Sequence, residues 1–253
     1  FIERHLSRAV AISKAAPIGP VHVNVPFREP LLIDFEELPH INVQPHFASE
    51  IIPSKQTIEY FQQTLQQTTK GVIVVGELPL NSDNSILWQL VRTLKWPVIV
   101  EALSNLRSNI PRDCMPYVVT TYDAFLKHEG TCQALAPQTV LRFGAQPVSK
   151  FLMQFLAKYS EHYIVIDESP LFRDSYAVAT QIVHATIGDW VQQFDASAID
   201  SAYIELWQQV QQITLNEIAN YKAYSIDEGA YVQQLLQSVN NANIFASSSM
   251  PIR

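Results

Sequence analysis

The spacing of apolar side chains changes several times along the chain, and each change marks an expected element. Residues 1–16 carry apolar side chains at helical spacing until a proline and a glycine end the run. Three valines then alternate with polar residues over 21–25, which predicts a strand with one apolar face. Residues 31–53 are polar, contain several prolines and keep no period, so we expect a linker there.

The middle of the chain, residues 54–195, alternates short apolar runs with amphipathic stretches of helical period. Helices are predicted over 54–68 and then in SDNSILWQLVRTLK, TTYDAFLKHEGTCQAL and VSKFLMQFLAKYS. The apolar runs predict strands in KGVIVVGELP, WPVIVEALSN, PQTVLRFGAQP, HYIVIDES and QIVHATIG. Strands that alternate with helices favour an α/β fold, a doubly wound parallel sheet with helices on both faces.

Two further amphipathic helices, over residues 200–222 and 227–239, precede a short predicted strand at 243–246. A single strand near either end of the chain has no partner to pair with. We therefore expect partial α/β domains on both sides of a complete central one. The expected stretches are the end of a first domain at 1–30, a linker at 31–53, the central α/β domain at 54–195 and the start of a third domain at 196–253.

Composition narrows the function classes. The net charge of −7 disfavours a nucleic-acid surface, which needs clustered Lys and Arg. No run approaches the roughly 18 apolar residues of a membrane span, and the first residues do not resemble a signal peptide. Cys114 and Cys132 are too far apart in sequence for a metal-binding pair, so we expect reduced thiols in a cytoplasmic protein. The common glycine-rich phosphate-binding motifs are absent from the sequence.

Four sequence blocks indicate a family. They are GPVHVNVPFREPL at 19–31, EALSNLRS at 101–108, LRFGAQPVSK at 141–150 and SSSMPIR at 247–253. In this order, the blocks resemble the 2-succinyl-5-enolpyruvyl-6-hydroxy-3-cyclohexene-1-carboxylate synthases of menaquinone biosynthesis, the MenD family of thiamine-diphosphate enzymes. The resemblance covers the whole chain and implies three α/β domains per polypeptide: pyrimidine-binding, central and diphosphate-binding.

The resemblance also implies an activity. Enzymes of this family decarboxylate 2-oxoglutarate on thiamine diphosphate, with Mg²⁺ or Mn²⁺, and add the resulting succinyl semialdehyde carbanion to isochorismate. The family's cofactor-activating Glu and its GDG-like metal motif would lie outside these residues, and the Gly-Asp pair after Ile187 lacks the rest of the motif. We therefore expect no catalytic, cofactor-binding or metal-binding residue in this chain, and no activity from it alone. The expected partners are the remainder of the polypeptide, the two substrates and further copies in a homodimer or homotetramer.

Both substrates are carboxylates, so cations near the carboxyl ends of strands are candidate site residues. Arg253 ends the SSSMPIR block, where the resemblance implies a substrate-binding Arg, and the Ser249 hydroxyl could donate to the same anion. Lys150 follows the third predicted strand, and some family members have Arg at this position, facing isochorismate. The alternatives are a solvated terminal Arg, a surface Lys, and a helix cap at the neighbouring Ser149.

Asn105 and Arg107 follow the second predicted strand and complete the substrate-binding candidates; the alternative is an Asn turn beside a solvated Arg. In some members the central domain also holds an inhibitory site for a naphthoate product, which Arg107 and Arg142 could form here. Arg28 and Glu29 belong to the first sequence block, but for them we expect a structural ion pair at the domain junction. Four histidines lack the spacing of metal ligands: His22, His40, His46 and His184.

Two other functions stay open. Another thiamine-diphosphate carboligase, of the acetolactate synthase type, shares the three-domain plan, although PFREPL and SSSMPIR argue against it. A stand-alone ligand-binding module would need no cofactor motif, although the expected partial domains at both ends disfavour it.

Overall fold

The computed structural model describes residues 2–15, 18–29, 31, 52–79, 82–169, 171–188, 200–221 and 227–247. The chain divides into two compact units, Phe1–Gln211 and Gln212–Arg253, and each is described by itself. These units do not test the predicted domain boundaries, which stay predictions.

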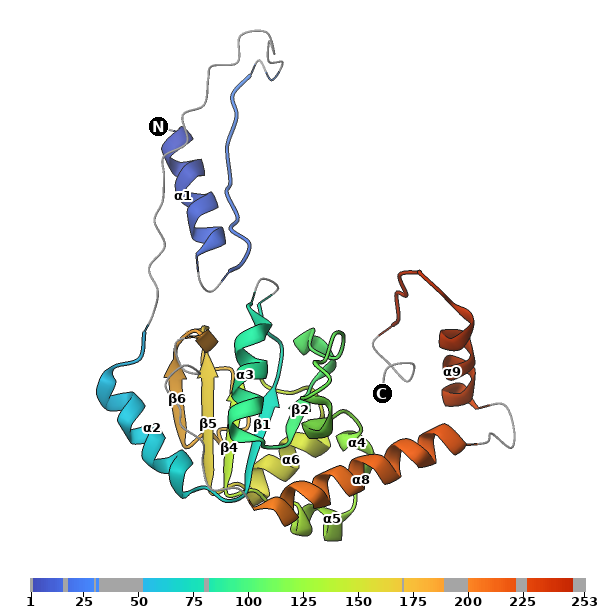
Figure 1. The fold of residues 1–253 in the computed structure, drawn as a ribbon. Coiled ribbons are helices and arrows are strands. Elements are labelled where there is room, and N and C mark those ends of the chain that lie inside the picture. The colour runs from blue at the N-terminus through green and yellow to red at the C-terminus, as the bar shows by residue number, and fades with distance from the viewer. Residues whose placement is uncertain are drawn as a thin grey trace. The chain divides into compact units, whose positions relative to one another are not determined.

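The first unit contains a six-stranded parallel sheet in the order β3-β2-β1-β4-β5-β6 (Figure 1). The strands are β1 (Gly71–Val75), β2 (Val98–Val100), β3 (Val118–Val119), β4 (Thr139–Phe143), β5 (His162–Asp167) and β6 (Gln181–His184). The chain builds outward from β1 to β3 and then returns to the other side of β1 with β4. This is a doubly wound order, so the predicted α/β fold is confirmed. The sequence analysis missed β3, because its two residues are too few to show a strand period.

Side-chain caps mark where the helices begin. At the start of α2, Ser54 accepts a hydrogen bond from the amide of Thr57 (3.2 Å), and Asp83 caps α3 through the amide of Ser85 (2.9 Å). The described helices around the sheet are α2 (Lys55–Gln67), α3 (Asn84–Leu94), α4 (Tyr122–Phe125), α5 (Glu129–Ala134) and α6 (Lys150–Tyr159). A longer helix, α8 (Ser201–Asn220), begins in the first unit and continues into the second.

One predicted helix is two helices in the structure. The stretch TTYDAFLKHEGTCQAL forms α4 and α5, separated by a short turn. His128 Nδ1 accepts from the amide of Thr131 (3.2 Å) and caps α5. The prediction of a single helix is wrong, since the cap starts a new helix at this point.

Both faces of the sheet are buried, because side chains alternate between the two faces along each strand. On one face, Ile73 and Leu141 pack against α2 and α3. On the other face, Val72 and its neighbours pack against α4, α5 and α6. The first turns of α8 add Tyr203 and Trp207 to this second layer, and both side chains are buried.

The segment before the sheet buries little apolar surface. The helix predicted near the N-terminus is present as α1 (Ile2–Lys14), but none of its residues is buried. The strand predicted at 21–25 is wrong, since residues 18–29 form no strand and Val21 is 39 % exposed. Within the described residues this run pairs with no neighbouring strand, which it would need for its backbone hydrogen bonds.

In the second unit, too, the predicted helix is present and the predicted strand is not. Helix α9 (Glu228–Ser238) is present as predicted. The strand predicted at 243–246 is wrong, because the described residues 242–247 form no strand and Phe245 is fully exposed. An apolar run of this length becomes a strand only beside another strand.

Candidate functional site

The carboxyl ends of β1 and β4 meet where the strand order reverses. The Gly76 amide donates to Phe143 O (3.0 Å), and the Ala145 amide donates to Glu77 O (3.0 Å). A Cβ on Gly76 would lie 1.8 Å from Ala145 O, so only glycine lets these loops come so close. Open α/β sheets bind ligands at this edge. The interlocked backbones fix the start of the loop that leads to Lys150.

The loop after β2 carries Asn105 and Arg107. Ser104 closes a 3₁₀ turn there: its hydroxyl donates to Glu101 O (2.6 Å) and accepts from the Leu106 amide (3.2 Å). Asn105 is exposed and has a φ of 60°, in the left-handed region that Asn tolerates better than most residues. The structure therefore has the Asn turn that was the alternative. A substrate contact of Asn105 stays a prediction.

Arg107 is exposed at the same edge, and one bond orients its guanidinium. Its Nε donates to Val100 O at 3.0 Å. Among the described carboxylates, none forms an ion pair with Arg107. A guanidinium held through Nε keeps its two Nη groups for a carboxylate, which they can bind as a fork.

Glu101 joins the β2 loop to α4. Its side chain is buried and accepts a hydrogen bond from the hydroxyl of Tyr122, the first residue of α4 (2.9 Å). Burial of the phenol, followed by the nearby Glu101 carboxylate, raises the pKa of Tyr122. The phenol therefore stays protonated at neutral pH and keeps donating to the carboxylate.

The loop after β4 ends at Ser149, which caps α6 by accepting from the Leu152 amide (3.1 Å). The Ser149 hydroxyl also donates to Asp123 Oδ1. Lys150 is the first residue of α6, is exposed, and forms no ion pair with a described carboxylate. A lysine here adds its charge to a helix N-terminus, which itself favours anions.

Two neighbouring residues of α4, Tyr122 and Asp123, tie the loops after β2 and β4 together. The first bonds Glu101 and the second bonds Ser149. Both loops that carry an exposed cation are thus fastened to one helical turn, and they leave strands on either side of β1. We treat this edge of the sheet as the candidate site.

Three of the five predicted substrate-binding residues lie at this edge: Asn105, Arg107 and Lys150. The other two, Ser249 and Arg253, lie outside the described residues. The substrate-binding roles of all five residues stay predictions.

Arg142, on β4, is fully buried and its guanidinium makes internal contacts. Nη2 donates to Arg173 O (2.7 Å), while Nη1 lies 3.4 Å from Tyr163 Oη and 3.9 Å from Asp174 Oδ1. Burial raises the pKa of Tyr163 to about 12. Because it is shielded from solvent, Arg142 acts as a core cation in this structure, which argues against the naphthoate site considered for it. An arginine inside an apolar strand was the sequence signal for this cluster.

Other groups considered in the sequence have minor structural roles. Arg28 and Glu29 form no ion pair within the described residues, and the structural ion pair expected at the domain junction stays a prediction. His184 stacks edge-on against Phe172 with ring centroids 5.5 Å apart, and His22 is exposed. His40 and His46 lie outside the described residues. In the described ranges, no three His, Cys, Asp or Glu side chains are grouped as metal ligands would be.

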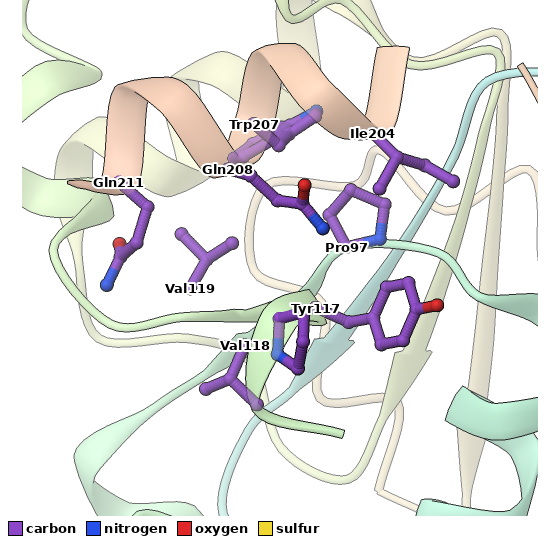
Figure 2. A pocket seen from close by; sticks show the side chains of 9 residues that line it. Pro97, Tyr117, Val118, Val119, Ile204, Trp207, Gln208 and Gln211 are labelled. Carbon is purple, nitrogen blue, oxygen red and sulfur yellow. The ribbon is translucent and has the colours of Figure 1, made fainter. Parts of the chain in front are cut away.

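The structure also has two hollows among its described residues. A groove of about 590 Å³ over α5 and α6 is lined by Lys127, Phe151, Tyr159 and neighbouring side chains. A hollow of about 10 Å³, roughly the room of one water molecule, lies where α8 passes β3 (Figure 2). Neither is lined by Arg107 or Lys150. Among the described helices, none is both long and apolar enough to cross a membrane.

A family model described as "Middle domain of thiamine pyrophosphate" matches residues 36–245. The chain belongs to this family of thiamine pyrophosphate enzyme middle domains. The matched residues include all six strands of the doubly wound sheet. Its fold is also similar to the crystal structure of benzoylformate decarboxylase from Polynucleobacter necessarius, with a TM-score of 0.53 and 15% identity. That match covers 76% of this chain and 36% of the other, and it concerns the fold alone.

Curated relatives of this chain share one name. The chain is 48% identical over 258 residues to the 2-succinyl-5-enolpyruvyl-6-hydroxy-3-cyclohexene-1-carboxylate synthase of Lysinibacillus sphaericus (strain C3-41). This match covers 100% of the chain and 45% of that protein. The synthase of Listeria innocua is 32% identical over 272 residues, with 100% and 46% covered. The chain therefore spans slightly less than half the length of these relatives. The resemblance predicted from the four sequence blocks is confirmed.

Proposed function

We propose that the full-length protein is a thiamine-diphosphate-dependent synthase. It decarboxylates 2-oxoglutarate and adds the succinyl semialdehyde carbanion to isochorismate, giving 2-succinyl-5-enolpyruvyl-6-hydroxy-3-cyclohexene-1-carboxylate and CO₂ for menaquinone biosynthesis. The observation that carries this proposal is the 48% identity, over the whole of this chain, to a relative with that name. Thiamine diphosphate would supply the carbanion chemistry together with Mg²⁺ or Mn²⁺. The remainder of the polypeptide would hold them, in a cytoplasmic homodimer or homotetramer.

The part of this chain in the reaction would be to bind substrate carboxylates. Arg107 suits this role, because the Nε bond to Val100 O fixes the plane in which the Nη groups point. Lys150 suits it as a point charge at the start of α6. Asn105 would add an amide at the same edge, while Arg253 and Ser249 are proposed from the sequence resemblance alone.

An assay of the full-length protein tests the activity. With 2-oxoglutarate, isochorismate, thiamine diphosphate and Mg²⁺, we expect the adduct and CO₂ to form together. Turnover of pyruvate in place of 2-oxoglutarate would support the acetolactate synthase type instead. Absence of turnover under all these conditions would contradict the synthase proposal and leave the binding module as the better explanation.

Variants of the two described cations test the role of the edge. Lys150→Ala and Arg107→Ala should each raise the KM for one carboxylate substrate by about 10- to 100-fold, the cost of a lost charge-assisted hydrogen bond. Lys55→Ala is the matched control, because Lys55 is also an exposed first residue of a Ser-capped helix, α2. If Lys150→Ala behaves like Lys55→Ala in an active enzyme, Lys150 is a surface lysine and only its assigned role is wrong.

A further inference from the structure

Gln211, on α8, binds the backbone that follows the edge strand β3. Its Oε1 accepts from the Thr120 amide (3.3 Å), the Thr121 amide (3.2 Å) and the Thr121 hydroxyl (2.7 Å). Its Nε2 donates to Thr120 Oγ1 (3.1 Å). One side chain thus makes four hydrogen bonds to two consecutive residues that lie about 90 positions earlier in the chain.

These bonds supply what the local sequence lacks. At the start of α4, Thr121 makes no capping hydrogen bond with its own side chain. The helix has only four residues, so it has little stability of its own. Gln211 acts as a cap from outside, because it satisfies the two amides that lead into α4.

The core holds Gln211 in place. Tyr203, Trp207 and Gln211 are spaced four residues apart and share one face of α8. The Tyr203 hydroxyl donates to Leu135 O (2.9 Å), and the Trp207 ring contacts Phe125 with centroids 6.0 Å apart. Figure 2 shows Trp207, Gln208 and Gln211 on the same stretch of helix, beside Val118 and Val119. Gln211 is therefore carried on a helix that is anchored in the core by two buried side chains, Tyr203 and Trp207.

The two residues that follow Thr121 are the ones that tie the candidate edge together. Tyr122 bonds Glu101 in the loop after β2, and Asp123 bonds Ser149 in the loop after β4. The backbone of residues 120–123, with hydrogen bonds at both of its ends, therefore links Gln211 to both loops.

We infer that Gln211 is a positioning residue for this edge: by holding Thr120 and Thr121 it fixes the first turn of α4, and through it the loops that carry Arg107 and Lys150. This inference rests on the proposed function as far as a substrate is concerned. A cation whose loop is already ordered loses less freedom when it binds a carboxylate, so its affinity is higher. Loss of the Gln211 contacts should then weaken substrate binding more than it slows the chemical step.

The test compares three variants of the full-length protein. Gln211→Met keeps the length and helix propensity of the side chain but removes the acceptor. Gln211→Glu keeps an acceptor for all three donors, and the Thr120 hydroxyl can rotate to donate to it. The matched control is Gln209→Met, which makes the same Gln-to-Met replacement at an exposed position of the same helix.

Amide hydrogen exchange is the first measurement, because it needs no substrate. In Gln211→Met we expect exchange about tenfold faster at Thr120 and Thr121, and also faster in segments 101–107 and 149–152. Gln211→Glu and Gln209→Met should exchange like the parent protein. Unchanged exchange in both segments would overturn the inference, whether or not the protein is a synthase. If Gln211→Met does not fold, Thr121→Val, which removes only the hydroxyl donor, takes its place with the same expected pattern.

Kinetics is the second measurement, in a protein that shows the synthase activity. Gln211→Met should raise the KM for a carboxylate substrate about three- to tenfold with kcat changed less than twofold, and Gln211→Glu should restore the KM. A three- to tenfold fall of kcat with an unchanged KM would mean that Gln211 only stabilises the fold. That result would overturn the positioning role. Absence of synthase activity would contradict the proposed function, and the exchange data would then decide on Gln211 alone.

Discussion

The two halves of α8, taken here as residues 201–211 and 212–220, differ sharply in burial, although one amphipathic pattern runs through both. In the first half, Tyr203 and Trp207 are 4 % and 1 % exposed. In the second half, Ile213 and Ile218 are 62 % and 48 % exposed. An apolar stripe on a helix therefore predicts a face that can be covered, and it does not predict where the cover ends.

Polar contacts follow the same division. The first half donates from Tyr203 to Leu135 O and binds Thr120 and Thr121 through Gln211, so its polar groups reach distant parts of the sheet domain. In the second half, the hydrogen bond of Gln212 goes to Asn216, four residues along the same helix. Long-range contacts of both kinds, apolar and polar, make the first half part of the sheet domain.

One substitution in each half of α8 tests whether the two halves differ in burial, and this pair has the largest expected effect on the free energy of unfolding. Trp207→Ala removes a buried ring from contacts with Phe125 and Phe155 and should lower the free energy of unfolding by about 3–5 kcal/mol. Ile213→Ala, on the exposed half, should change it by less than about 0.5 kcal/mol. Urea unfolding followed by circular dichroism measures both. Similar losses for the two variants would mean that the halves are equally covered in solution.

A second pair extends the comparison to arginines. Arg142→Met leaves the Asp174 carboxylate, 6 % exposed, without its cation and Arg173 O without its donor, so we expect a loss of about 3 kcal/mol in the free energy of unfolding. The control is Arg112→Met, at an exposed position, with an expected change within about 0.5 kcal/mol. A double variant, Arg142→Met with Asp174→Leu, should recover part of the loss, because it removes the carboxylate that the first substitution leaves without a cation. Failure to recover anything would argue that packing of the Arg142 stem, and not its charge, matters.

The central sheet was predictable because local signals agree there. The run 71–75 is apolar at every position, as buried parallel strands are, and caps such as Ser54 and Asp83 stand directly before the periodic stretches. The prediction at 21–25 relied on alternation alone, and the prediction at 243–246 relied on a short apolar run. A strand also needs a partner, which no local pattern reports.

The candidate site was predictable only in part. The positions of Arg107 and Lys150 at strand ends follow from the order of strands and helices, so sequence reasoning reached them. The bonds of Gln211 to Thr121 and of Arg142 to Arg173 O join residues that are far apart in the chain. Hydrophobic period says which side chains face a core, but it does not say which polar groups meet there.

The smallest expected effect on stability belongs to the exposed cluster of Glu129, Lys158 and Tyr159. An exposed ion pair contributes little to the free energy of unfolding. Glu129 accepts hydrogen bonds from Lys158 Nζ (2.5 Å) and Tyr159 Oη (2.6 Å), and these, Lys158 first, lower the pKa of Glu129 from 4.5 to about 2. A carboxylate whose pKa is lower in the folded state stabilises the fold above its unfolded pKa, and this contribution is lost as the pH falls from about 4.5 toward 2. The melting temperature of Glu129→Gln should therefore lie slightly below that of the parent at pH 7, with a difference that shrinks below pH 4.5. Glu161→Gln is the matched control, since Glu161 is exposed and forms no ion pair with a described cation. We expect only a small difference in melting temperature at pH 7, because solvent screens an exposed ion pair. A difference that grows as the pH falls would contradict the direction of the Glu129 pKa shift.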